Sequence, residues 1–263
     1  MSAVDLLDDR PAVTPAEVRL SLLQGFELTV DGAPQDLPPS AQRLVAFLAL
    51  QARPVVRSHV AGVLWGNRSD ARAAACLRSA IWRINTGHGA AVVNAGRSRL
   101  LLDPGVVVDV RDAAALAHQQ LAGGGAAADP GLLRGELLPG WYDDWVLVER
   151  ERLRQLCLEA MEQMAESLLT AGHPRLAIEA ALGVVATEPL RESAYRVLID
   201  AHVAAGNRGE ALRQFDRCRT TLRQELGLAP GDALVAAAAR AHGPAAVVRG
   251  AQAALAAAGA VEA

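Results

Sequence analysis

The 263-residue sequence contains no lysine, so all 26 of its basic side chains are arginines. A P-loop ATPase needs a lysine to reach the β- and γ-phosphates, and the absence of lysine excludes that class. Enzymes that hold a substrate or pyridoxal phosphate as a Schiff base need a lysine amine, and they are excluded for the same reason.

Cysteine is also scarce, and no uncharged apolar run reaches the ~18 residues that cross a bilayer. The cysteines are Cys76, Cys157 and Cys218, and this wide spacing argues against a disulfide framework and a zinc site. Residues 1–17 are polar and acidic, without the basic and apolar regions of a secretory signal. We therefore expect buried thiols, no metal or cofactor, no membrane contact and a cytoplasmic protein.

Acidic side chains are nearly absent from one part of the chain. Between Ser40 and Leu100, nine arginines and a single acid, Asp70, leave a local net charge of +8, although the whole chain carries −3. A compact basic segment in an otherwise acidic protein is typical of a surface that binds a polyanion. A merely solvated surface usually mixes both signs, so this segment is the first candidate for contact with nucleic acid.

The residues from 18 to 104 predict a small α+β unit. Its predicted elements are, in order, strands over 18–23 and 26–30, a turn at Asp31-Gly32, a return strand over 35–37, a helix capped by Ser40 and closed by Pro54, helices over 58–65 and 70–85, and hairpin strands over 91–94 and 98–102. Strands, three helices and an arginine-tipped hairpin follow the order of a winged helix-turn-helix. In that fold the third helix fits the major groove of DNA.

The rest of the sequence predicts helices, with a 34-residue repeat. Ala171-Gly172-His173 and Ala205-Gly206-Asn207 are 34 residues apart, and Ala177 and Ala211 have the same offset. This period is typical of tetratricopeptide repeats. The predicted organisation is a disordered leader (1–17), a winged helix-turn-helix DNA-binding domain (18–104), an all-α tetratricopeptide-like domain with a break at 123–130 (105–242) and a flexible Ala-rich tail (243–263).

Several motifs resemble the Streptomyces antibiotic regulatory proteins, in which an OmpR-like winged helix precedes a bacterial transcriptional activator domain. The resemblance covers roughly residues 18–241, and its main motifs are Ala61-Gly-Val-Leu-Trp-Gly66, Leu77-Arg-Ser-Ala-Ile-Trp-Arg83, Leu137-Leu-Pro-Gly-Trp-Tyr-Asp-Asp-Trp145, Glu149-Arg-Glu-Arg-Leu153 and Gly206-Asn-Arg-Gly-Glu-Ala-Leu212. It implies a regulator that binds double-stranded DNA at direct repeats near promoters, as a possible dimer. It also implies recruitment of RNA polymerase through the sigma and core subunits, and activation of pathway genes such as those of secondary metabolism.

The chain departs from the family pattern in three respects. We expect neither the nucleotide-binding and sensor regions of larger relatives nor a receiver domain with a phosphorylatable aspartate. Trp82 stands where relatives of this fold often have a small polar or basic residue, and Ala74 and Ala75 cannot hydrogen-bond to bases. We therefore expect a larger share of phosphate contacts and shape recognition.

The candidate DNA-binding residues all lie in the basic segment. They are Arg43, Arg57, Arg68, Arg72, Arg78, Ser79, Trp82, Arg83, Arg97 and Arg99. Arg78 and Arg83, with Ser79 between them, are the predicted base contacts, because a bidentate arginine–guanine pair discriminates by about 1–3 kcal/mol. Either arginine could instead pair with an acid of the second domain.

The other candidates have less specific roles. Arg72 suits a phosphate contact, and Arg43 and Arg57 suit either phosphate or solvent. One of Arg97 and Arg99 is expected to face DNA and the other solvent. For Trp82, packing on the protein is favoured over contact with a thymine methyl group.

An aromatic and acidic cluster, Trp141-Tyr-Asp-Asp-Trp145, offers another interpretation. Adjacent carboxylates point apart and suit shared catalysis poorly, so we expect a helix cap and aromatic anchors against the winged helix. The sequence has no Gly-x-Ser-x-Gly nucleophile motif, and no enzyme activity is predicted. Two alternatives remain open: a protein–protein adaptor, and a small-molecule sensor with a ligand groove lined by Trp141, Tyr142 and Trp145.

Overall fold

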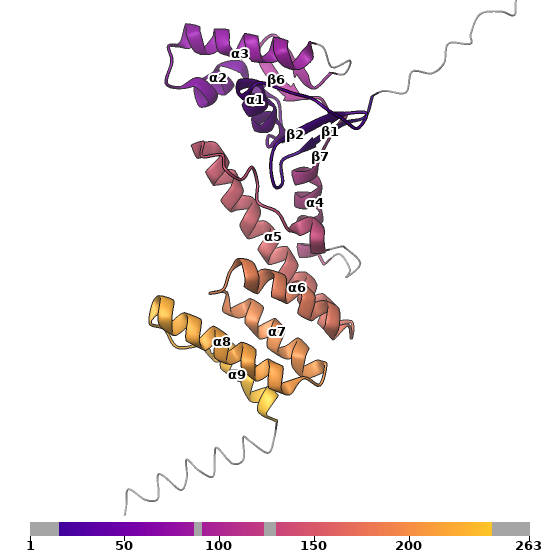
Figure 1. Ribbon diagram of the computed structural model, residues 1–263, viewed down its shortest axis with the longest axis vertical. Coiled ribbons are helices and arrows are strands. Elements are labelled where there is room, and N and C mark those ends of the chain that lie inside the picture. Colours follow the sequence, from indigo (N-terminus) through magenta and orange to yellow (C-terminus); the bar gives the residue numbers. More distant parts are fainter. Residues whose placement is uncertain (1–15, 87–90, 124–129, 244–263) are drawn as a thin grey trace, which may run out of the picture. The chain divides into compact units, whose positions relative to one another are not determined.

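The computed structural model describes residues 16–86, 91–123 and 130–243, and contacts divide the chain into two compact units (Figure 1). The first comprises the residues up to Arg111 together with Glu136–Glu149, and the second comprises Asp112–Gly135 and the residues from Arg150 onward. Most of the expected leader, of the 123–130 break and of the tail lies outside the described residues. The described chain is mainly helical, as the sequence predicts, and none of its helices is both long and apolar enough to cross a membrane.

The first unit contains a four-stranded sheet in the order β3-β2-β1-β7. Its strands are β1 (Val18–Ser21), β2 (Glu27–Val30), β3 (Ala33–Pro34) and β7 (Val106–Val108). β1 pairs antiparallel with β2 and parallel with β7, which places Leu20 opposite Leu28 and Val108. Alternate residues of β1, β2 and β7 are buried, because successive side chains of a strand point to opposite faces.

The outcome for the predicted strands is mixed. β1, β2 and the turn at Asp31-Gly32 are confirmed, with positive φ at both turn residues. The return strand is wrong by two residues, because this tight turn pairs Ala33 directly with Val30. β7 was not predicted.

Three helices and a smaller sheet complete the first unit. They are α1 (Pro39–Ala49), α2 (Arg57–Trp65) and α3 (Asp70–Asn85), with strands β4 (Val55–Val56), β5 (Val93–Ala95) and β6 (Arg99–Leu102) in the order β4-β6-β5. The bounds of α3 are those predicted. The predicted Ser40 cap is wrong, because Pro38 is the N-cap and Ser40 lies within the first turn. Pro39 starts the helix without a backbone N–H that would need an acceptor.

Asp109 and Arg111 fasten the sheet and α1 together. The Asp109 carboxylate accepts hydrogen bonds from the backbone N–H groups of Leu22 at 2.9 Å and Leu23 at 2.9 Å. The Arg111 guanidinium donates to the Ala49 carbonyl oxygen at 2.8 Å, at the end of α1 where helical carbonyls lack partners. These two side chains therefore connect the start of the sheet with the helix that follows it.

The second unit is helical. Its elements are α4 (Asp109–Leu121), a 3-10 turn (Pro130–Leu133), α5 (Asp144–Thr170), α6 (Pro174–Thr187), α7 (Glu192–Ala204), α8 (Arg208–Leu226) and α9 (Asp232–His242), and the first residues of α4 and α5 belong to the first unit. Helix α7 packs against α6, α8 and α9, as Figure 1 shows in orange and yellow.

The 34-residue repeat is present in the structure. α6 begins at Pro174 and α8 at Arg208, and Gly172 and Gly206 turn the chain before them with φ of 80° each. Glycine adopts this left-handed conformation without the steric cost of a Cβ. Residues at equivalent positions share the same burial, as in the pairs Met161 and Tyr195, Met164 and Leu198, and Ala177 and Ala211.

The three cysteines are free thiols. Burial raises the pKa of Cys157 to about 11 and that of Cys218 to about 12, which keeps both thiols protonated. The prediction of buried thiols is confirmed for these two and is wrong for Cys76, which is half-buried on α3.

We expect Asp109→Ala to lower the free energy of unfolding by about 1–3 kcal/mol, because two part-buried backbone N–H groups lose their acceptor. Thermal or urea denaturation measures this loss. Asp112→Ala is the control, since this carboxylate is exposed and makes no hydrogen bond within the described chain. Equal losses for both variants would contradict the role assigned to Asp109.

Candidate nucleic-acid interface

Helix α3 has one buried and one exposed side. Ala73, Leu77, Ala80 and Ile84 are buried and recur every three or four residues, so the side chains between them point outward. The exposed side carries the five candidate residues predicted on this helix, namely Arg72, Arg78, Ser79, Trp82 and Arg83. The periodicity of α3 therefore gathers these candidates on one surface.

The hairpin β5–β6 is attached to both α3 and α2. The Asn85 side-chain amide donates to the Val93 carbonyl oxygen at 2.9 Å, which ties the end of α3 to β5. Arg57 donates through its backbone N–H to the Ser98 carbonyl at 2.9 Å and through Nη1 to the Gly96 carbonyl at 3.1 Å. Arg57 is half-buried, and it positions the hairpin beside α2.

Arg97 and Arg99 are both exposed at the hairpin. Arg97 lies in the turn before β6 and Arg99 is the first residue of that strand. We expect one of these arginines to face DNA and the other to face solvent, but their exposure does not distinguish them, because both are exposed. Both side chains are available to a ligand.

Most candidate arginines have no acidic partner. Within the described chain, no ion pair involves Arg57, Arg68, Arg72, Arg78, Arg83, Arg97 or Arg99. In the second unit, ion pairs with carboxylates are formed by Arg154, Arg191, Arg196, Arg213, Arg219 and Arg240. The unpaired arginines therefore give α3 and the hairpin a surface that attracts anions.

Arg43 differs from the other candidates. Its guanidinium forms an ion pair with Asp143 inside the first unit, and the two side chains are only 30% and 26% exposed. A phosphate group would have to displace this carboxylate. The structure therefore does not place Arg43 with the exposed arginines.

The aromatic residues near Asp143 pack on the first unit. The Trp141 ring stacks on Phe26 with centroids 6.1 Å apart, and Trp145 meets Phe47 edge-on at 5.4 Å. The prediction of aromatic anchors is confirmed for both tryptophans. Tyr142 instead is 79% exposed and does not share the packed position of the two tryptophans, so its exposure gives no support to a ligand groove lined by all three rings.

Trp82 is 66% exposed, and the expectation that it packs on the protein is wrong. It lies on the side of α3 opposite the buried residues. On the same side, Ala75 is too small to cover an indole, and the Arg78 side chain is itself exposed. The sequence pattern of α3 already predicts that Trp82 is exposed, because its position lies outside the buried stripe formed by Ala73, Leu77, Ala80 and Ile84.

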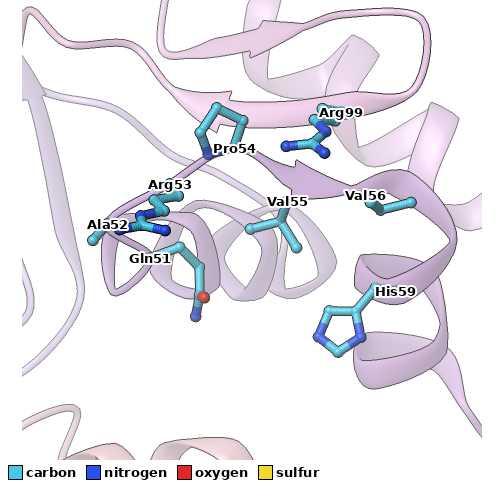
Figure 2. A pocket seen from close by; sticks show the side chains of 8 residues that line it. All are labelled: Gln51, Ala52, Arg53, Pro54, Val55, Val56, His59 and Arg99. Atoms are coloured by element: carbon cyan, nitrogen blue, oxygen red, sulfur yellow. The ribbon is translucent and has the colours of Figure 1, made fainter.

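A shallow pocket of about 550 Å³ adds residues that the sequence did not single out. Figure 2 shows Arg53 and Arg99 on either side of Pro54, with His59 on the first turns of α2. The pairing of Val55 with Leu100 brings Arg53 and Arg99 into this pocket. Arg53 belongs to the basic segment, but only the β4–β6 pairing shows that it lies near the hairpin. Two arginines and a histidine suit an anionic group such as a phosphate.

Comparison with known proteins gives a consistent assignment. Residues 108–241 match the family model of the bacterial transcriptional activator domain. The regulatory protein AfsR of Streptomyces coelicolor (strain ATCC BAA-471 / A3(2) / M145) is 26% identical over 219 residues, which cover 73% of this chain and 21% of AfsR. AfsR of Streptomyces griseus is 28% identical over 224 residues, or 79% of this chain and 22% of the relative. The chain therefore spans about a fifth of the length of the curated relatives it matches.

A solved structure is similar over both units. It is Mycobacterium tuberculosis EmbR in complex with a low-affinity phosphopeptide, with a TM-score of 0.67 and 23% sequence identity. The alignment covers 86% of this chain and 65% of that one. At this identity the likeness shows the fold alone.

We expect Asp143→Ala to lower the free energy of unfolding by about 1–2 kcal/mol, because it leaves the half-buried Arg43 guanidinium without its partner. In an Arg43→Met background the same change should cost less, so a double-mutant cycle in urea measures the coupling. Asp144→Ala, which removes the neighbouring exposed carboxylate, is the matched control. A coupling of zero would show that the pair contributes nothing to stability.

Proposed function

The chain belongs to the family that carries the bacterial transcriptional activator domain, and we propose that its first unit is a winged helix-turn-helix that binds double-stranded DNA. The chain is a transcriptional regulator of the type of the Streptomyces antibiotic regulatory proteins. We assign residues 18–104 to the DNA-binding domain and 105–242 to the activator domain, close to the matched range.

The observation that carries this proposal is the uncompensated arginine surface. α3 and the hairpin expose arginines without acidic partners in the described chain, whereas the second unit pairs many of its arginines with carboxylates. Phosphates supply the missing negative charge, and their release of counterions favours binding. An α-helix with exposed arginines also has the dimensions and the donors that the major groove accepts.

The candidate residues divide into two roles. Arg78, Ser79 and Arg83 contact base edges from α3, since they are exposed on one side of the helix. Arg97, at the hairpin tip, reaches the adjacent minor groove or backbone. The remaining contacts go to phosphates, from Arg53, Arg57, Arg68, Arg72 and Arg99.

The resemblance to the regulators of antibiotic production supports the rest of the mechanism. Two copies of the chain bind direct repeats near a promoter, and the activator domain contacts the sigma and core subunits of RNA polymerase. The result is activation of pathway genes such as those of secondary metabolism. This role places the protein in the bacterial cytoplasm, where the promoter DNA lies, and involves no catalytic step.

We expect Arg78→Ala/Arg83→Ala to lose sequence-specific binding. Each bidentate arginine discriminates by about 1–3 kcal/mol, so affinity for a site selected from random DNA should fall about 5- to 150-fold per arginine. Arg175→Ala/Arg223→Ala removes the same charge from exposed positions of the second unit and should bind almost normally. Gel-shift titration with selected and scrambled DNA measures the affinity of both double variants. Retained selectivity in Arg78→Ala/Arg83→Ala would contradict the assignment of the base contacts.

Arg53→Ala/Arg99→Ala should weaken binding to all sequences alike. Each lost phosphate contact should reduce the slope of log affinity against log salt concentration by about 0.9. Titrations at several salt concentrations measure this slope, with Arg175→Ala/Arg223→Ala as the control of equal charge. An unchanged slope would remove the pocket residues from the interface.

The adaptor alternative makes the opposite prediction for the wild-type chain. An adaptor whose winged helix has lost DNA binding would enrich no sequence from a random pool at either low or high salt. Enriched direct repeats, with affinity falling steeply as salt rises, support the regulator instead.

A further inference from the structure

The position of Trp82 is unusual for an indole. A tryptophan side chain that is 66% exposed leaves a large apolar surface in water, and burying such a surface stabilises a complex. Within the described chain, the Trp82 ring makes no aromatic or cation–π contact. The ring is therefore free to contact a partner.

The surroundings of Trp82 indicate which partner. Arg78 lies one turn before it on the same side of α3, and Arg83 follows it directly. Both arginines are exposed and form no ion pair in the described part of the chain. An apolar protein surface that docked on Trp82 would have to cover these two uncompensated charges, whereas DNA would neutralise them.

Two and three turns before Trp82, the same side of α3 carries alanines. Ala71 and Ala75 are exposed on the same side and carry neither donors nor acceptors. In the major groove, the one apolar group on the base edges is the 5-methyl group of thymine. An indole between two arginines therefore matches a thymine beside bases that accept hydrogen bonds.

We propose that Trp82 is a specificity-determining residue that contacts the 5-methyl group of a thymine in the major groove. This inference rests on the proposed DNA-binding function. Arg78 and Arg83 hydrogen-bond to bases or phosphates on either side, and Trp82 adds an apolar preference that the alanines of α3 do not supply.

The test replaces each thymine of the selected DNA site, one at a time, by deoxyuridine, which removes only the methyl group. At one thymine, wild-type affinity should fall about fourfold, the factor that burying one methyl-sized group contributes. Trp82→Ala should bind more weakly than wild type and should be insensitive to that replacement. Trp82→Phe should restore part of the sensitivity, and circular dichroism should show that both variants remain folded.

The outcomes separate this inference from the function on which it rests. If Trp82→Ala shows the wild-type deoxyuridine profile, or no thymine is sensitive in wild type, the methyl contact is wrong. If Trp82→Ala binds the thymine and the deoxyuridine site more weakly than wild type by the same factor, so that the difference of about fourfold between the sites persists, the ring acts by stacking or protein contact, which also overturns the proposal. Loss of selectivity in Arg78→Ala/Arg83→Ala would meanwhile leave the DNA-binding function standing. A wild-type chain that selects no sequence would refute both.

Discussion

The burial of one side of α3 is the constraint on which the candidate interface depends. Leu77, Ala80 and Ile84 must face the core of the first unit, and a helix of 3.6 residues per turn then fixes every other direction. Arg78 and Arg83 are exposed as a consequence of that packing. The hydrogen bonds between Asn85 and Val93 hold the hairpin against the end of this helix, so the arginines of two segments keep a defined relation within one unit.

The same residue type has two roles in this lysine-free chain. In the second unit, arginines bridge separate segments, as in the pair of Arg154 with Glu188 and that of Arg191 with Glu162 at 2.7 Å. The planar guanidinium suits such pairs because it donates several hydrogen bonds in fixed directions. On α3 and the hairpin the same group lacks a carboxylate within the described residues and keeps its capacity for phosphates and guanines. The capacity of α3 and the hairpin to bind DNA therefore depends on the absence of acidic partners there as much as on the presence of arginines.

The sequence predicts well what depends on neighbouring residues. The periodicity of α3, the Asp31-Gly32 turn and the 34-residue repeat are all local signals, and each is present in the structure. Contacts between distant segments were missed, since no local pattern specifies them: β7 joins β1 across the whole first unit, and Arg43 meets Asp143 one hundred residues later. For the same reason most of the exposed site residues follow from the helical pattern, whereas the proximity of Arg53 to Arg99 required the β4–β6 pairing. Trp82 is exposed, although its apolar character favours packing, because its position on α3 lies outside the buried stripe.

The central claim is that the first unit, and not the second, contacts DNA. Hydrogen-exchange mass spectrometry of the full chain, with and without DNA selected from a random pool, tests it directly. Slower exchange should appear in peptides from α2, α3 and the β5–β6 hairpin, because a bound duplex covers these surfaces and restrains their opening. The helices α6 to α9 should exchange at the same rate in both samples. Protection confined to α6–α9, with none in α3 or the hairpin, would contradict the account.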